Sequence, residues 1–215
     1  MYPYQMQIAD ALFFLLHDEK DRPRVRARVL GLVLAAGLLG ELAITRKIGL
    51  YQGGVYVSSR DEPQEVLSAG IFAEIRGQPG RDLLVWLTAL AGISTARVTD
   101  RLVAASLLEL PPLIRHRPFR TRRTPTHTIK NTKIAELSWL VPMNKLHRRS
   151  TLDSGDKFIL GVAMAAGLDG FLLQGTPAAT RTYADQMVRQ LPDLLGSLVA
   201  DVEATVGNDV LIYRN

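Results

Sequence analysis

Two long uncharged runs constrain the fold of this chain more than any other feature of its sequence. They span residues 29–40 (VLGLVLAAGLLG) and 158–168 (FILGVAMAAGL), and both consist of apolar residues and glycine. A helix needs about 20 apolar residues to cross a bilayer, so both runs are too short and favour buried core helices of a soluble protein. Small residues in the first run would let a second helix approach closely: Ala35, Ala36, Gly37 and Gly40.

The composition favours a mainly α-helical fold. Of the 215 residues, 47% are apolar and only 7% are aromatic, and the chain relies on Leu and Ala. Strands prefer β-branched and aromatic residues, so we predict one domain over residues 1–215 with about eight helices and one or two small β-hairpins.

The absence of cysteine excludes disulfides, cysteine zinc sites and thiol catalysis. No basic stretch precedes the first apolar segment, so we expect no signal peptide and a cytoplasmic location.

Local signals divide the chain into predicted elements. A hairpin is indicated where IGLY and VYVSS flank QGG at residues 48–59. The VLIYRN tail favours a short strand. Helices are predicted at residues 6–17, 25–46, 61–78 with Pro63 in the first turn, 81–90, from a Ser94 or Thr95 cap to about 108, 134–146 with a kink at Pro142, 155–173 capped by Ser154, from Thr176-Pro177, and from Pro192 to about 206.

Positive charge is concentrated in one part of the chain. Residues 111–149 hold ten Lys or Arg and one acid, Glu136, so their net charge is +9. Since the whole chain has a net charge of +5, the rest of the chain holds −4. The prolines of PPLIRHRPFRTRRTPTHTIKNTK (111–133) exclude a helix and allow a two-stranded excursion with its tip near residues 115–122. Such a segment suits an anionic partner, namely lipid headgroups, nucleic acid or acidic protein. The alternative is a solvated loop.

The sequence carries no catalytic or metal-binding signature. Phosphate-cradling loops, HExxH and GxSxG are absent. The SxxK spacing of Ser154 and Lys157 lacks its usual partners, and a helix cap explains it. His116 and His127 would face each other across a hairpin, but no carboxylate lies nearby in the sequence to complete a metal site. We therefore expect no enzyme, no metal and no cofactor.

Several stretches occur in a familiar order. IADALFFLLHDEKDR is followed by GELAITRKI, whose glutamate lies 23 residues after Asp18. TARVTDRLVAASLLEL then precedes the basic segment, and SGDKFILGVAMAAGLDGFLL follows it. This order resembles the Golgi phosphoprotein 3 family over roughly residues 6–200. The composition is similar to that of the actinobacterial branch of this family.

The resemblance implies an all-helical domain with a central bundle and small hairpins. Eukaryotic members bind phosphatidylinositol 4-phosphate on Golgi membranes and link glycosyltransferase tails to coat proteins. Their lipid pocket uses one aromatic residue and three arginines, whose positions fall here on Arg26, Ala35, Ala96 and Thr99. The family's specific phosphate-binding set is therefore absent from this chain.

Other arginines could rebuild an anion site from shifted positions, because a guanidinium binds phosphate through two hydrogen bonds. The candidates are Arg24, Arg26, Arg28, Arg97 and Arg101. The alternative is that these are surface arginines, with Arg101 paired to a carboxylate. In the family, the segment that corresponds to 111–133 is a projecting hairpin for membrane contact and self-association. Here its apolar part would be Leu113, Ile114 and Phe119, with headgroup contacts from Arg115, Arg117, Arg120, Arg122 and Arg123.

These observations lead to one functional hypothesis with two rivals. We expect a non-catalytic adaptor, peripherally bound to acidic phospholipid or phosphoinositide headgroups at the inner face of the membrane. The first rival is an oligomeric interaction protein that uses the 111–133 arm for self-association. A nucleic-acid binder is less favoured because only Phe119 and the distant Trp139 could stack on bases. The sequence does not identify a protein client.

Overall fold

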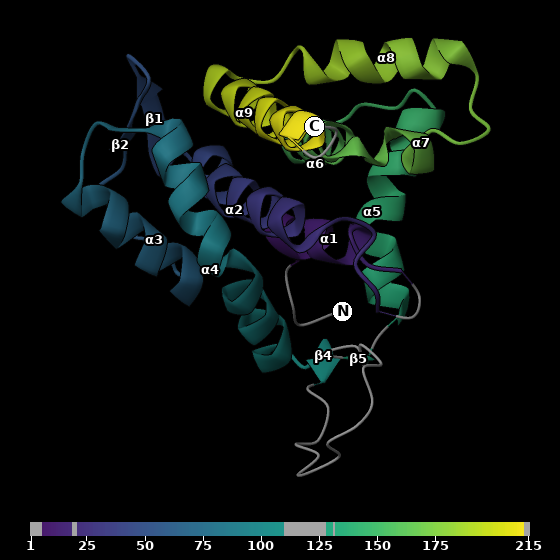
Figure 1. Ribbon diagram of the computed structural model, residues 1–215. Coiled ribbons are helices and arrows are strands. Elements are labelled where there is room, and N and C mark those ends of the chain that lie inside the picture. The colour runs from purple at the N-terminus through teal and green to yellow at the C-terminus, as the bar shows by residue number, and fades with distance from the viewer. Residues whose placement is uncertain (1–5, 19–20, 110–127, 131, 213–215) are drawn as a thin grey trace.

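A computed structural model describes residues 6–18, 21–109, 128–130 and 132–212. It confirms the mainly helical fold (Figure 1). In chain order, the elements are α1 (Ile8–Leu15), α2 (Ala27–Ile44), β1 (Ile48–Tyr51), β2 (Gly54–Val57), α3 (Val66–Gly77), β3 (Arg81–Asp82), α4 (Leu83–Ala104), β4 (Leu108–Glu109), β5 (Thr128–Ile129), α5 (Thr132–His147), α6 (Ser154–Ala163), the π-helical turn η1 (Met164–Leu168), α7 (Asp169–Leu172), α8 (Ala178–Val188) and α9 (Asp193–Ile212).

Helix α2 lies at the centre of the core. It packs against α1, α4, α6 and α9, and every residue from Val29 to Leu42 is buried. Among the described helices, α2 is the one whose length and apolar composition would also suit a membrane span, yet 78% of it is buried inside the protein. This burial agrees with the core helix predicted from the first uncharged run.

Glycines of α2 let three neighbouring helices approach closely. A β-carbon on Gly31 would overlap the backbone carbonyl of Ala91 in α4. One on Gly37 would meet the Ala9 backbone of α1 at 2.9 Å, and one on Gly40 would overlap the Phe158 ring of α6. The predicted role of Gly37 and Gly40 in close helix packing is confirmed.

Two small antiparallel sheets complete the described fold. The first has the order β1-β2-β3, with Ile48 opposite Val57 and Tyr51 opposite Gly54. Gln52 and Gly53 in its tight turn both have positive φ angles, of 49° and 79°, which suits a two-residue hairpin turn. The predicted hairpin is therefore confirmed. The second sheet pairs β4 with β5, and it lies at the opposite end of the molecule from α8 and α9 (Figure 1).

Several predicted helix boundaries were wrong. Helix α3 begins after Glu65, which accepts hydrogen bonds from the amides of Leu67 and Ser68, so Pro63 precedes the helix. Helix α4 is continuous from Leu83 to Ala104 and is capped by Asp82. Ser94 does not begin a new helix, because its hydroxyl donates a 2.6 Å hydrogen bond to the Gly31 carbonyl of α2.

Three further boundaries also differ from the predictions. Asp153, and not Ser154, caps α6, and its side chain accepts a hydrogen bond from the amide of Asp156. Gly167, with a φ angle of 81°, interrupts the predicted helix at residues 155–173. The tail does not start a strand at Val210, because α9 continues to Ile212.

Candidate functional site

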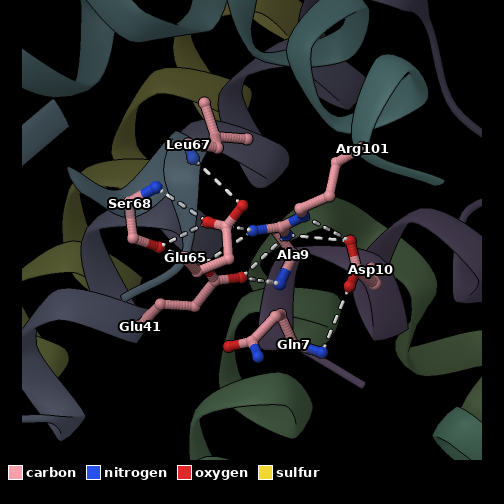
Figure 2. A network of polar contacts seen from close by, with 8 residues as sticks. All are labelled: Gln7, Ala9, Asp10, Glu41, Glu65, Leu67, Ser68 and Arg101. Carbon is pink, nitrogen blue, oxygen red and sulfur yellow. Dashed lines mark hydrogen bonds and ion pairs between the residues drawn. The ribbon is translucent and has the colours of Figure 1, made fainter. Parts of the chain in front are cut away.

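A buried ionic cluster joins four helices around Arg101 (Figure 2). The Arg101 guanidinium lies 2.8 Å from Asp10, 3.0 Å from Glu41 and 3.3 Å from Glu65. Its side chain is only 7% exposed. We call these four residues the Arg101 cluster. Asp10 comes from α1, Glu41 from the last turn of α2, Glu65 from the cap of α3, and Arg101 from the last turn of α4.

Backbone amides at two helix N-termini complete the cluster. The Ala9 amide donates to Glu41 at 2.8 Å, and the Gln7 amide donates to Asp10 at 3.1 Å. The Ser68 amide donates to Glu65 at 2.8 Å. Helix N-termini favour negative charge, so α1 and α3 help to hold three carboxylates around a single guanidinium.

The carboxylates of the cluster differ in their electrostatic environment. Burial raises the pKa of Glu41 above its ordinary value, although Arg101 acts in the opposite direction. Partial burial also tends to raise the pKa of Glu65. The Leu67 and Ser68 amides, the Ser68 hydroxyl and the Arg101 charge together outweigh that effect, so the pKa of Glu65 is lowered. The pKa values of the two glutamates beside Arg101 are therefore shifted in opposite directions.

Buried carboxylates hold the Arg101 guanidinium, and this arrangement does not favour its assignment to an anion site. An incoming anion would have to displace buried carboxylates that already hold the guanidinium. The groove beside the cluster is also acidic. Its volume is about 490 Å³, and its lining includes Glu41, Asp61, Glu62 and Glu65. The alternative interpretation, in which Arg101 is paired to a carboxylate, is the one that the structure supports.

The remaining candidate arginines do not converge on one site with Arg101. Arg97 lies 3.7 Å from Glu74 of α3 and is partly exposed. Arg24 stacks on the Phe171 ring, with 4.1 Å from its guanidinium carbon to the ring centroid. Arg28 lies 13 residues before Glu41 on α2, which corresponds to about 20 Å along a helix.

Arg28 lines an open groove between α2, α4 and α9 that measures about 410 Å³. Most of the other lining residues are apolar or small, including Leu32, Ala91 and Val206. Arg26 is exposed and directly precedes the first residue of α2. Of the other positions matched to the family's lipid pocket, Ala35 is buried, Thr99 is half-buried and Ala96 is exposed.

The arm residues predicted to contact a membrane lie outside the described residues. These are Leu113, Ile114, Arg115, Arg117, Phe119, Arg120, Arg122 and Arg123. The ends of the segment are described. Leu108 pairs with Ile129 and Glu109 pairs with Thr128, in antiparallel register. The paired ends agree with a two-stranded base for the excursion.

Sequence reasoning missed the carboxylates that bind Arg101. The available signal was an ionisable residue inside an otherwise apolar helix, because a lone charge there needs a partner. Asp10 in IADALFFLL and Glu41 in LLGELAI both fit that description.

Within the part of the chain that the structure describes, no group of three or more His, Asp or Glu side chains is arranged to hold a metal ion.

The lowered pKa of Glu65 gives a testable pH dependence. A carboxylate whose pKa falls below its ordinary 4.5 on folding stabilises the fold above that pH, and this contribution is lost as the pH falls through the folded-state value. Glu65→Gln should therefore lower the free energy of unfolding by about 1 kcal/mol at pH 7. The deficit should shrink towards pH 3.

Urea unfolding of wild type and Glu65→Gln across this pH range measures the difference. The raised pKa of Glu41 acts in the opposite sense, because its favourable contribution is greatest at low pH and is lost as the pH rises. Only the difference between the two proteins isolates Glu65. Glu62→Gln, in an exposed pair with Arg76, is the control. A deficit that stays constant from pH 7 to pH 3 would contradict a role for the Glu65 charge.

Comparison with known proteins agrees with the resemblance seen in the sequence. The model of the Golgi phosphoprotein 3 (GPP34) family matches residues 8–206. The matched region begins at the first residue of α1 and extends into α9, so it includes every member of the Arg101 cluster. A search of the curated proteins gives no match. Since the family model covers nearly the whole chain, the chain belongs to the Golgi phosphoprotein 3 family.

Proposed function

We propose that this protein is a non-catalytic adaptor that binds peripherally to acidic phospholipid headgroups at the cytoplasmic face of a membrane. The separation of charge along the chain carries this proposal. Residues 111–149 hold +9 and the rest of the chain holds −4. Membership of the Golgi phosphoprotein 3 family supports the same function.

The basic segment is long enough for useful electrostatic binding. Each Lys or Arg near an anionic membrane contributes roughly 1 kcal/mol. Five of the ten basic residues would therefore give a favourable free energy of about 5 kcal/mol. Since this attraction acts over a Debye length of about 8 Å at physiological ionic strength, binding should weaken strongly as salt is added.

We expect the choice of lipid to follow charge more than headgroup structure. The four positions matched to the family's phosphoinositide pocket are Arg26, Ala35, Ala96 and Thr99, so only one of them bears a cation. The Arg101 guanidinium is held by carboxylates. Phosphatidylglycerol should then substitute for phosphatidylinositol 4-phosphate at equal surface charge.

Vesicle co-sedimentation at low and physiological salt tests the proposal. Wild type should pellet with vesicles of phosphatidylglycerol, phosphatidylinositol or its 4-phosphate, but not with neutral vesicles. A variant with five arginines of the segment replaced by alanine should lose most of this binding: Arg115, Arg117, Arg120, Arg122 and Arg123. The control removes five cations elsewhere and should retain binding: Arg60, Arg76, Lys157, Arg181 and Arg189.

Failure of wild type to pellet with any of these lipids would overturn the membrane proposal. The arm would then be assigned to self-association, which light scattering would detect as a mass above that of one chain. A clear preference for phosphatidylinositol 4-phosphate at equal charge would instead show that a specific pocket exists outside the four matched positions.

A further inference from the structure

Helix α5 presents apolar side chains on its outer side. Leu137 and Val141 lie one turn apart, with exposed fractions of 50% and 44%. The helix packs against α1, α6 and α8, and buries Met143 and Leu146 on its inner side. An exposed leucine next to an exposed valine on the same helical face gives this surface an apolar centre.

Cations lie at both ends of this apolar centre. The spacing of Lys133, Leu137, Val141 and Asn144 places them on one side of the helix. Arg148 and Arg149 directly follow the last residue of α5, His147. We call these six residues the α5 face. Lys133 and Arg148 are exposed, as is the neighbouring Arg149, and none of the three has an acidic partner among the described residues. Glu136 lies at the edge of the face.

Two other cations lie near α5 but outside the α5 face, namely Lys145 and Arg24. Lys145 is directed away from it, because its amino group lies 2.6 Å from Asp156 of α6. Arg24 is exposed and stacks on Phe171, whose ring centroid lies 5.6 Å from that of Trp139 in α5. The turn between α1 and α2 thus adds another exposed cation beside α5.

Two of the other exposed apolar residues, Val66 and Leu84, have acidic neighbours. Val66 follows Glu65 and lies close in sequence to Asp61 and Glu62, and Leu84 donates its amide to Asp82. The α5 face therefore combines exposed aliphatic side chains with cations that no described carboxylate neutralises. This combination is complementary to an anionic bilayer, where apolar side chains enter the boundary between headgroups and acyl chains and cations bind phosphates.

The position of α5 also suits a role beside the basic segment. Helix α5 begins at Thr132, three residues after strand β5 ends at Ile129. The lower end of α5 and the β4–β5 sheet lie at the same end of the molecule (Figure 1). Lys133 and the last helical residue, His147, are 14 residues apart, or about 21 Å of helix, which is long enough to span several headgroups.

We propose that the α5 face docks on the surface of an anionic lipid bilayer, with Leu137 and Val141 inserted and Lys133, Arg148 and Arg149 at the phosphates. This inference rests on the proposed peripheral membrane function and assigns a contact surface for it. The helix would lie in the plane of the interface and would add to the contacts of the 111–133 segment.

Two variants of the full-length chain test the apolar and the basic parts of the α5 face. Leu137→Ser/Val141→Ser should weaken partition into phosphatidylglycerol vesicles about tenfold. Lys133→Ala/Arg148→Ala/Arg149→Ala should weaken it about a hundredfold, since each of the three cations corresponds to about fivefold. Val66→Ser/Leu84→Ser, which removes exposed apolar side chains elsewhere, is the matched control and should bind like wild type. Circular dichroism verifies that each variant is folded.

A fluorescent label measures insertion directly. The chain has no cysteine, so Leu137→Cys gives a single site for an environment-sensitive dye. Its emission should shift to the blue with phosphatidylglycerol vesicles and not with neutral vesicles. The same dye at Val66→Cys should not respond.

The outcomes separate this inference from the proposed function. If wild type binds anionic vesicles but the dye at residue 137 does not respond and the serine variant binds normally, the α5 inference is wrong and the membrane function stands. If wild type binds no vesicle, both are wrong. A blue shift without lipid, together with a concentration-dependent mass, would replace the bilayer with a second copy of the chain.

Discussion

Arg101→Ala is expected to destabilise the protein by about 3–5 kcal/mol, because removal of one partner of a buried ion pair leaves the other charge uncompensated. The substitution would leave Asp10 and Glu41, both buried, and the half-buried Glu65 without their shared cation. The cost should appear as a lower midpoint in urea and a lower melting temperature at pH 7. The four helices of the cluster would lose their common polar contact.

Arg97→Ala provides the matched control, because Arg97 lies one turn earlier on the same helix. Its 3.7 Å contact with Glu74 is between partly exposed side chains, and such pairs contribute at most about 1 kcal/mol. Equal stability of the Arg101→Ala and Arg97→Ala variants would contradict a stabilising role for the Arg101 cluster.

The same pair of variants distinguishes a structural from a lipid-binding role for Arg101. If Arg101 bound headgroups, Arg101→Ala would weaken vesicle binding with little loss of stability. The geometry predicts a large loss of stability instead, and the folded molecules of the variant should bind vesicles like wild type. Arg101→Lys should fall between wild type and alanine, because an ammonium group cannot replace the planar guanidinium that contacts three carboxylates.

Gly31→Ala is expected to lower the free energy of unfolding by about 1–3 kcal/mol or more, because the added methyl group overpacks the contact between α2 and α4. The added β-carbon would overlap the carbonyl oxygen of Ala91, which belongs to the backbone of a continuous helix and cannot rotate away. Separation of the two helices would also stretch the hydrogen bond from the Ser94 hydroxyl to the Gly31 carbonyl. Thermal unfolding measures the combined effect.

Gly92→Ala is the control for this prediction, since it makes the same chemical change on the partner helix. Apart from the two adjacent residues and the nearby backbone of α4 itself, no atom lies within 4 Å of the position that a β-carbon on Gly92 would take. Because alanine favours a helix over glycine by about 1 kcal/mol, this variant should be as stable as wild type or more so. If Gly31→Ala also proved stabilising, the close contact between α2 and α4 would be refuted.

The sequence by itself determined the features that depend on local pattern. The uncharged run at residues 29–40 predicted a core helix, because a helix that is apolar on all sides must be buried. The QGG turn between two β-prone stretches predicted the β1–β2 hairpin, because glycine allows the positive φ angle that the turn needs. The order of the motifs was sufficient to indicate the family, which the match to residues 8–206 confirms.

Helix boundaries were decided partly by contacts across the fold. Ser94 has the chemistry of a helix cap, yet α4 continues through it because its hydroxyl finds a partner on α2, 63 residues earlier. Asp153 and Ser154 are neighbours, and either could cap α6. Asp153 is the cap, because its carboxylate accepts a hydrogen bond from the Asp156 amide. Propensity alone does not rank such alternatives.

Only the tertiary structure decided which arginines could meet an external anion. Arg97 and Arg101 are one turn apart and look equivalent in the sequence, but Arg97 is partly exposed and Arg101 is enclosed by carboxylates from three other helices. Those carboxylates lie 36, 60 and 91 residues away along the chain. The strength of an ion pair depends on distance and burial in space, and neither quantity can be read from the spacing of residues in a sequence.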